Sequence, residues 1–194
     1  MSSYQTINIL DMIDAIGEDN VKEILSDFSC PKNREIENFV RNNAIEFAKR
    51  KMSVTHLVVN ENGDVSAIFT LTHKAIEISN EGLSSASKKK ISRYAHLDEM
   101  SNSYILSAFL IAQFGKNFEL SPQEVPDGDQ LMENAWKILV KVQHDVGGGI
   151  VYLECENSPK LLSFYQNEHN RFRVFNERYS ETDQTKYIQL FRFL

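Results

Sequence analysis

Two polar side chains stand at the two ends of one strand-to-helix junction near the C-terminus. The stretch YLECENSPKLLSFY, residues 152–165, passes from a short apolar run to Asn157, and then to a Ser-Pro pair typical of a helix start. Tyr165 follows on the second turn of the predicted helix. A phenol with an ordinary pKa of about 10 can give a proton to a departing group. As plain alternatives, Asn157 is a turn residue and Tyr165 an aromatic at the edge of the core.

A second candidate site lies where another predicted strand ends and the following helix begins. The apolar run YILSAFLIAQF ends near Gly115, and the next helix opens with Asp127, Gly128 and Asp129. Ligands of open α/β sheets bind at the carboxyl ends of parallel strands, and free N–H groups at a helix start attract phosphate. This pattern favours a diphosphate-bearing ligand. In the alternative interpretation, the two aspartates only cap the helix.

The elements that would position these residues alternate between helix and strand. Asn62-Gly63 between two β-rich runs predicts a hairpin. The run at 104–114 is nearly all apolar, which indicates a strand buried on both faces. It should lie parallel to the strand at 150–155, with a right-handed crossover, in a mixed α/β sheet. The expected helices are 18–28, 34–51, 127–146 and one from Pro159, and the expected strands are 54–59, 64–72, 104–114, 150–155 and two in the C-terminal tail.

The amino-acid composition argues against several classes of function. The 194 residues include 21 Lys and Arg against 27 Asp and Glu, for a net charge of −6. This charge argues against broad adhesion to DNA or anionic lipid. Cys30 and Cys155 make neither a disulfide framework nor a metal site. With no apolar span and no secretory signal, a cytoplasmic protein without membrane contact is expected. The basic run at 88–90 is either a solvated face or a contact for phosphate or an acidic partner.

Several stretches, in order along the chain, resemble the GNAT superfamily of acyl-CoA-dependent N-acetyltransferases, in particular bacterial members of similar length. They are FSCPKNREIENFVRNNAIEF, HLVVNENGDVSAIFTL, FLIAQFGKN, and GGGIVYLECENSPKLLSFY running on to RFRVF. The resemblance implies a single GNAT domain over residues 1–194, with a mixed sheet, splayed parallel strands and helices on both faces. It also implies that helices within residues 1–52 cover the sheet and form part of the substrate side.

The resemblance implies cofactor contacts for the second candidate site. Backbone groups of Phe114, Gly115 and Lys116 would hold the pantetheine arm of acetyl-CoA. Gly128 and Asp129 fall in the stretch that aligns with the family's pyrophosphate loop. That loop usually reads Arg or Gln, two residues, Gly, one residue, and Gly or Ala, and only the first Gly is present here.

The resemblance also implies roles at the strand-to-helix junction. Asn157 would contact the cofactor arm, and Tyr165 would lie by the thioester sulfur, as a cofactor contact and as the general acid for the departing thiolate. His73 is a candidate base, although a surface histidine is the alternative. In the turn after the helix, Asn170 could adopt a left-handed conformation in place of the family's glycine.

The implied function is transfer of an acetyl group from acetyl-CoA, as co-substrate and without a metal, to a primary amine. The amine could belong to a small molecule, a protein or an aminoacyl-tRNA, and the net charge disfavours nucleic acid. The alternative is a GNAT-fold binding or regulatory module with little catalysis. Edge strands at the hairpin or the C-terminus could also form a homodimer.

Overall fold

The computed structural model describes residues 4–181 and 184–194, which form two compact units. Unit 1 contains the residues up to Thr72 together with Ile111–Lys137. Unit 2 contains His73–Leu110 together with Ile138–Leu194. Three elements pass through both units: strands β3 (Val65–Ser79) and β5 (Ser103–Lys116) and helix α6 (Gly128–Val146). No helix in these described ranges is long and apolar enough to cross a bilayer.

Unit 1 begins with one short strand and four short helices. The side-chain oxygen of Asn8, the last residue of β1, accepts a hydrogen bond from the N–H of Leu10 at 2.9 Å and so caps α1. Gly17, with φ +86°, ends the same helix and allows the chain to turn directly into the next one. The elements are β1 (Gln5–Asn8), α1 (Ile9–Ile16), α2 (Glu18–Ser26), α3 (Arg34–Asn42) and α4 (Ala44–Lys49).

The prediction of a single helix over 34–51 is wrong, because the chain breaks between α3 and α4. Asn43 lies at the break, with φ −121° and ψ −26°. Val40, Ala44 and Ala48 are buried on both sides of it. The apolar spacing therefore continues through the break, and spacing alone does not reveal it. Asparagine favours such a break because it has a low helix propensity.

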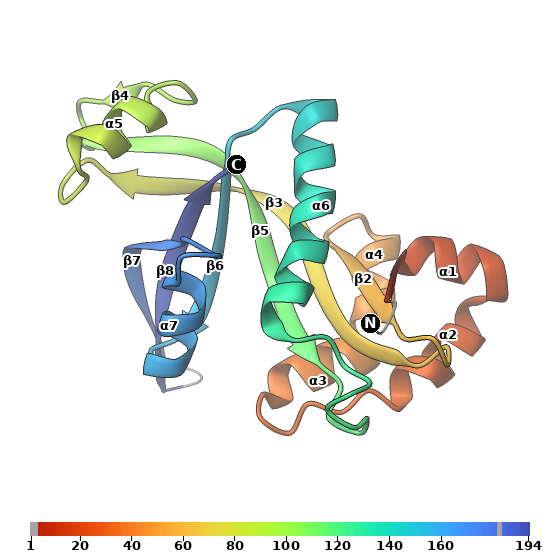
Figure 1. The fold of residues 1–194 in the computed structure, drawn as a ribbon. Helices are drawn as coiled ribbons and strands as arrows, with labels where there is room; N and C mark the ends of the chain where they lie inside the picture. The colour runs from red at the N-terminus through yellow and green to blue at the C-terminus, as the bar shows by residue number, and fades with distance from the viewer. Residues whose placement is uncertain (1–3, 182–183) are drawn as a thin grey trace. The chain divides into compact units, whose positions relative to one another are not determined.

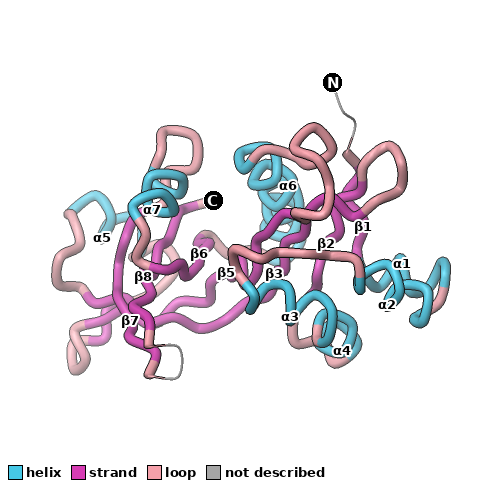
Figure 2. The backbone as a smooth tube through the Cα atoms, turned by 90° about the horizontal axis from the view of Figure 1, so that it is seen from below, coloured by secondary structure: helices cyan, strands magenta, loops and turns pink. Residues whose placement is uncertain are grey.

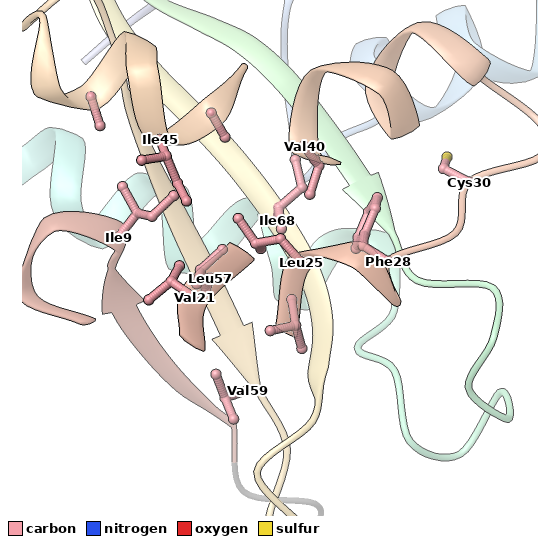
Figure 3. Packing of buried hydrophobic residues seen from close by; sticks show 13 residues of the cluster. Ile9, Val21, Leu25, Phe28, Cys30, Val40, Ile45, Leu57, Val59 and Ile68 are labelled. Carbon is pink, nitrogen blue, oxygen red and sulfur yellow. The ribbon is translucent and has the colours of Figure 1, made fainter. Parts of the chain in front are cut away.

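One apolar core joins α1–α4 to the strands of unit 1 (Figure 3). Leu57 on β2 (Val54–Val59) and Ile68 on β3 pack against Val21, Leu25 and Ile9 from the helices. Figure 2 shows α3 and α4 on one face of β2 and β3, and the start of α6 on the opposite face. The sheet of unit 1 is therefore covered on both faces. The buried members of the core are Ile9, Val21, Leu25, Phe28, Cys30, Val40, Ala44, Ile45, Ala48, Leu57, Val59, Val65 and Ile68.

The predicted hairpin is confirmed in unit 1. β2 and β3 pair antiparallel from Val54 opposite Leu71 to Val59 opposite Val65. In the turn, the side chain of Asn60 accepts hydrogen bonds from the N–H groups of Asn62 and Asp64, each at 2.9 Å. Gly63 supplies the positive φ that the turn needs, at +93°. The second strand continues past the predicted end at 72, to Ser79.

Unit 2 contains the parallel pair of the sheet. β5 pairs parallel with β6 (Ile150–Glu156), with Phe109 opposite Val151 and Leu110 opposite Tyr152. β6 pairs along its whole length with the antiparallel β8 (Thr185–Phe193), and β7 (Arg173–Ser180) completes this side. Figure 1 shows α5 (Ser85–Ile91) and the two-residue β4 (Leu97–Asp98) near the end of β3 and the start of β5.

The strands pair in the order β1-β2-β3-β5-β6-β8-β7, and β4 pairs with β5, so the sheet is mixed, as expected. In the described chain, the register between β5 and β6 covers only two residue pairs. This short register is what splayed parallel strands require. A second apolar cluster fills unit 2, and its buried members are Ile76, Ile78, Ile91, Tyr104, Leu106, Ala108, Ile150, Tyr152 and Phe191.

The prediction that the strand at 104–114 is buried on both faces is wrong, most clearly in its first half. Tyr104, Leu106 and Ala108 are buried, whereas Ile105 is 63% exposed and Ser107 is also exposed. One face of this part of β5 is therefore solvated. The apolar composition did not reveal the exposed face, because isolated apolar side chains are common on protein surfaces.

Candidate functional site

The strand-to-helix junction of unit 2 forms where the sequence predicts it. β6 ends at Glu156, and the N–H of Asn157 donates to the carbonyl oxygen of Lys186 on β8 at 3.1 Å. Ser158 is the N-cap of α7 (Pro159–Gln166), with Pro159 in the first helical position. The hydrogen bond of Asn157 fixes its backbone at the end of the strand, while its side chain lies on the exposed surface.

Tyr165 lies on the buried side of α7, in contrast to the exposed Asn157. Only 7% of it is exposed, and its ring packs edge-on against Phe164 and Phe172, with centroid distances of 5.0 and 6.0 Å. Burial raises the pKa of the phenol well above its ordinary value, and the neighbouring Cys155 on β6 adds to the increase. The phenol therefore keeps its proton at neutral and moderately alkaline pH. The raised pKa also makes the buried phenol a weaker proton donor than an exposed tyrosine, so the shift by itself does not favour an acid role. The packing of the ring agrees with the alternative interpretation, an aromatic at the edge of the core.

The loop after α7 fixes the end of the helix that carries Tyr165. Asn170 is fully buried; its side-chain amide donates to the carbonyl oxygen of Phe164 at 2.9 Å, and its N–H donates to the side chain of Asn167 at 2.6 Å. The N–H of Phe172 donates to the carbonyl oxygen of Tyr165 at 2.9 Å. The left-handed residue of this turn is Arg171, with φ +56°, and the expectation that Asn170 takes this conformation is wrong. Asn170 instead uses its side chain to close the helix end.

In unit 1, the end of β5 lies tightly against the start of α3. Gly115 is buried, and a Cβ atom at this position would lie 3.0 Å from Cγ2 of Ile36. A side chain at this position would therefore require Ile36 to shift. Phe114 and Lys116 on either side of Gly115 are half-buried. The close packing fixes the backbone groups that are predicted to hold the pantetheine arm.

Asn117 anchors this strand end, although the sequence did not single it out for a role. Its N–H donates to the carbonyl oxygen of Ser66 at 2.8 Å, and its side-chain amide donates to that of Val65 at 2.9 Å. Its side-chain oxygen accepts from the N–H groups of Ser29 at 3.0 Å and Glu119 at 3.1 Å. A polar residue directly after an apolar strand was the only signal in the sequence, and its partners lie far along the chain.

A pocket of about 660 Å³ opens beside this strand end, entirely within unit 1. Its lining includes Lys116 from β5 and Asp127 and Gln130 from the start of α6. Burial lowers the pKa of Lys116; Lys32 adds to this effect and Asp127 opposes it. The pocket thus combines the cation of Lys116, which suits an anionic ligand, with the carboxylate of Asp127, which opposes one.

The beginning of α6 is closed by a reciprocal pair of hydrogen bonds. The N–H of Gln130 donates to the side chain of Asp127 at 2.7 Å, and the N–H of Asp127 donates to the side chain of Gln130 at 2.9 Å. This arrangement is a capping box. It agrees with the alternative interpretation, in which Asp127 only caps the helix. The cap places a carboxylate where a diphosphate would otherwise bind to free N–H groups. Gly128 is half-buried and Asp129 exposed in the first turn.

The predicted site residues thus fall into two sets. Phe114, Gly115 and Lys116 at the end of β5 and Gly128 and Asp129 at the start of α6 belong to unit 1, whereas Asn157 and Tyr165 belong to unit 2. The joint action of the two sets on one acetyl-CoA molecule stays a prediction. His73, the candidate base, is exposed on β3. Cys155 is buried, as expected of a small apolar side chain.

The sequence matches no protein-family profile and no curated protein. Many solved structures are similar to this fold. AtaT complexed with acetyl-methionyl-tRNAfMet is 14% identical, with a TM-score of 0.67 over 98% of this chain and 95% of that chain. A Tyr-to-Phe variant of KacT is 12% identical, with a TM-score of 0.66 over 98% and 94%. AtaTR bound with AcCoA is 14% identical, with a TM-score of 0.60 over 98% and 92%. The chain therefore has the GNAT fold, as the resemblance implied.

Proposed function

We propose that this chain is a GNAT-type N-acetyltransferase that uses acetyl-CoA. The observation that carries the proposal is the position of Tyr165 on α7, the helix that directly follows the parallel strand β6, which is where the resemblance implies a general acid. AtaTR, a protein of the same fold, has been solved with acetyl-CoA, which supports acetyl-CoA as the donor. In unit 1, the cation of Lys116 fits an anionic group of the donor, while the carboxylate of Asp127 opposes one.

In the proposed reaction, the acceptor amine attacks the thioester carbonyl of acetyl-CoA. A C–N bond forms and the C–S bond breaks. Tyr165 gives its proton to the departing sulfur, and the proton lost by the amine passes to a base or water and restores the phenol. Backbone N–H groups would stabilise the oxyanion that forms between these steps. Asn157 would hold the pantetheine arm.

We propose the amine of an aminoacyl-tRNA as the acceptor, in a bacterial cytoplasm where this RNA and acetyl-CoA are both present. The support comes from the neighbouring structure of AtaT, which was solved with acetyl-methionyl-tRNAfMet, and from another neighbour described as a bacterial toxin. The expectation from the net charge, that nucleic acid is disfavoured, is not borne out among these neighbours. An overall negative charge does not prevent RNA binding when the cations are gathered on one surface. Helices α1–α4, within residues 1–52, would then border the acceptor.

The second candidate function is a GNAT-fold module with little catalysis. The capping box of Asp127 and Gln130 favours it, because the box occupies helix N–H groups that could bind a diphosphate. Under this alternative the chain would bind acetyl-CoA weakly or not at all.

Steady-state kinetics of Tyr165→Phe test the proposed catalytic role. Free CoA thiol is followed with aminoacyl-tRNA as acceptor, and acetyl-CoA affinity is measured by calorimetry. The expected result is a fall in kcat of about 10²- to 10⁴-fold, with acetyl-CoA affinity little changed. Tyr152→Phe is the matched control, since Tyr152 on β6 is another buried tyrosine of unit 2 and belongs to the second apolar cluster, of which Tyr165 is not a member. Equal turnover of Tyr165→Phe and wild type would exclude Tyr165 as the acid, and a lack of turnover in wild type would favour the second function.

A further inference from the structure

The basic segment, residues 84–95, has a charge that the rest of the chain does not share. It contains Lys88, Lys89, Lys90 and Arg93 and no acidic residue, for a charge of +4. Since the whole chain carries −6, the remaining residues carry −10. Such a local concentration of cations in an acidic chain marks a surface for an anionic partner.

The structure turns these cations outward. Ser84 caps α5 by accepting from the N–H of Ser87 at 3.1 Å, and Ser87 and Ile91 are the buried residues of this helix. Lys89, Lys90 and Arg93 are exposed and Lys88 is half-buried. Because Ser87 and Ile91 are one helical turn apart, α5 has a single inward face and presents its charge on the remaining surface.

The charge of this segment is not neutralised within the described residues. A second basic run, Lys49–Lys51, provides the contrast: Lys49 pairs with Glu18 at 2.8 Å, and Arg50 pairs with Glu46 at 3.9 Å. Among the ion pairs of the described chain, none involves a lysine of α5 or Arg93. Instead, Lys90 lies 5.2 Å above the ring of Phe193. Four cations therefore remain available to an external anion.

An exposed aromatic ring stands beside these cations. Tyr94 is 46% exposed, and its N–H donates to the carbonyl oxygen of Ile91 at 2.8 Å. Its ring lies against Gly149, so closely that a Cβ atom there would be 2.1 Å from the ring. The missing side chain of Gly149 therefore leaves room for the ring, while nearly half of Tyr94 stays exposed. Exposed aromatic residues close to cations are typical of surfaces that stack unpaired bases.

We propose that the basic segment binds the sugar-phosphate backbone of the acceptor RNA, with Tyr94 stacking on an unpaired base. The inference rests on the proposed aminoacyl-tRNA acceptor. A membrane surface fits less well, because interfacial helices insert an apolar face and the apolar Ile91 of α5 is fully buried. Figure 1 shows α5 well apart from α7, which carries Tyr165, within unit 2. An extended polynucleotide can reach both, so the segment positions RNA without taking part in the chemistry.

The test compares two triple variants of consecutive basic residues. One is Lys88→Gln/Lys89→Gln/Lys90→Gln; the matched control is Lys49→Gln/Arg50→Gln/Lys51→Gln. Affinity for deacylated tRNA is measured by fluorescence anisotropy between 50 and 200 mM salt. The α5 variant should bind at least about tenfold more weakly at low salt, and the slope of log K against log[salt] should flatten by about 2 to 3. The control should stay within about twofold. Tyr94→Ala should weaken binding at least about fivefold, and Tyr94→Phe should preserve it.

Activity readouts separate this inference from the proposed function. The α5 variant should lose kcat/KM toward aminoacyl-tRNA, while its acetyl-CoA affinity and its transfer to a small aminoacyl amide remain at wild-type levels. If wild type transfers acetyl to no amine, the proposed function fails, and the anisotropy series still decides whether the segment binds RNA. Wild-type tRNA affinity and salt slope in the α5 variant would overturn the inference. If the α5 variant lost binding to phosphatidylglycerol vesicles but kept its affinity for tRNA, the inference would also be overturned, and the segment would be assigned to a lipid surface.

Discussion

His56 makes the stability of unit 1 depend on pH. It lies on β2 opposite Phe69 of β3, and the two rings stack with centroids 5.1 Å apart. Only 8% of His56 is exposed. Burial lowers its pKa from 6.5 to about 4, and the carboxylate of Asp11 acts in the opposite direction. The folded protein therefore holds His56 neutral under conditions where the unfolded chain already protonates it.

The direction and size of the effect follow from the two pKa values. Above pH 6.5 both states hold a neutral imidazole, and His56 adds no pH dependence. Between pH 6.5 and about 4 the unfolded state binds the proton and the folded state does not, so the free energy of unfolding falls as the pH falls. The difference between the two pKa values corresponds to about 3 kcal/mol. The loss is nearly complete when the pH reaches the folded-state pKa.

The assay is urea unfolding followed by circular dichroism at several pH values from 7.5 to 4, on wild type and His56→Phe. Carboxylates contribute to acid lability in both proteins, so the measured quantity is the difference in unfolding free energy between them. This difference should shift by about 3 kcal/mol in favour of the variant across the range. His96→Asn is the control for the loss of an exposed histidine, and it should follow wild type. Parallel pH curves for wild type and His56→Phe would refute the reasoning.

Three further predictions concern unit 1. Asn117→Ala removes hydrogen bonds to Ser29 and to other backbone groups. The free energy of unfolding, measured in urea titrations, should therefore fall by about 2–4 kcal/mol. A loss below measurement error would contradict the anchoring role. Gly115→Ala brings a methyl group against Ile36 and should cost about 1–3 kcal/mol, with partial recovery in the double variant with Ile36→Ala; absence of recovery would locate the strain elsewhere. Asp127→Ala should lower the free energy of unfolding by about 1 kcal/mol, because the helix loses its cap. Calorimetry should show that the variant binds acetyl-CoA as tightly as wild type or more tightly. Weaker binding by the variant would mean that the carboxylate does not oppose the ligand.

Local patterns predicted the junction that carries the candidate acid. Ser158 and Pro159 have strong positional preferences at helix starts, and Asn62-Gly63 has an equally strong preference for hairpins. These preferences depend only on neighbouring residues in the sequence, so the helix start and the hairpin turn form at the positions of these residues. The burial of Tyr165 could not be predicted from the sequence, because the spacing of residues on a helix face does not show what packs against that face.

The features that the sequence did not predict depend on contacts between distant residues. Asn117 acquires its importance from Ser29 and Val65, which are far from it along the chain. The break at Asn43 leaves the apolar spacing intact, so it is invisible to a pattern of periodicity. The alternating exposure of β5 around Ile105 depends on which elements cover that strand. In each case residue types set the local preference, and the packing of the folded chain decides the outcome.

The central claim is acetyl transfer from acetyl-CoA to the amine of an aminoacyl-tRNA. The most direct measurement is transfer of radiolabelled acetyl from acetyl-CoA to a pool of aminoacyl-tRNA by the purified wild-type chain, with the deacylated pool as control. The account predicts label on the aminoacyl-tRNA, none on the deacylated pool, and loss of labelling in Tyr165→Phe. Absence of label at saturating acetyl-CoA, or equal labelling by Tyr165→Phe, would contradict it.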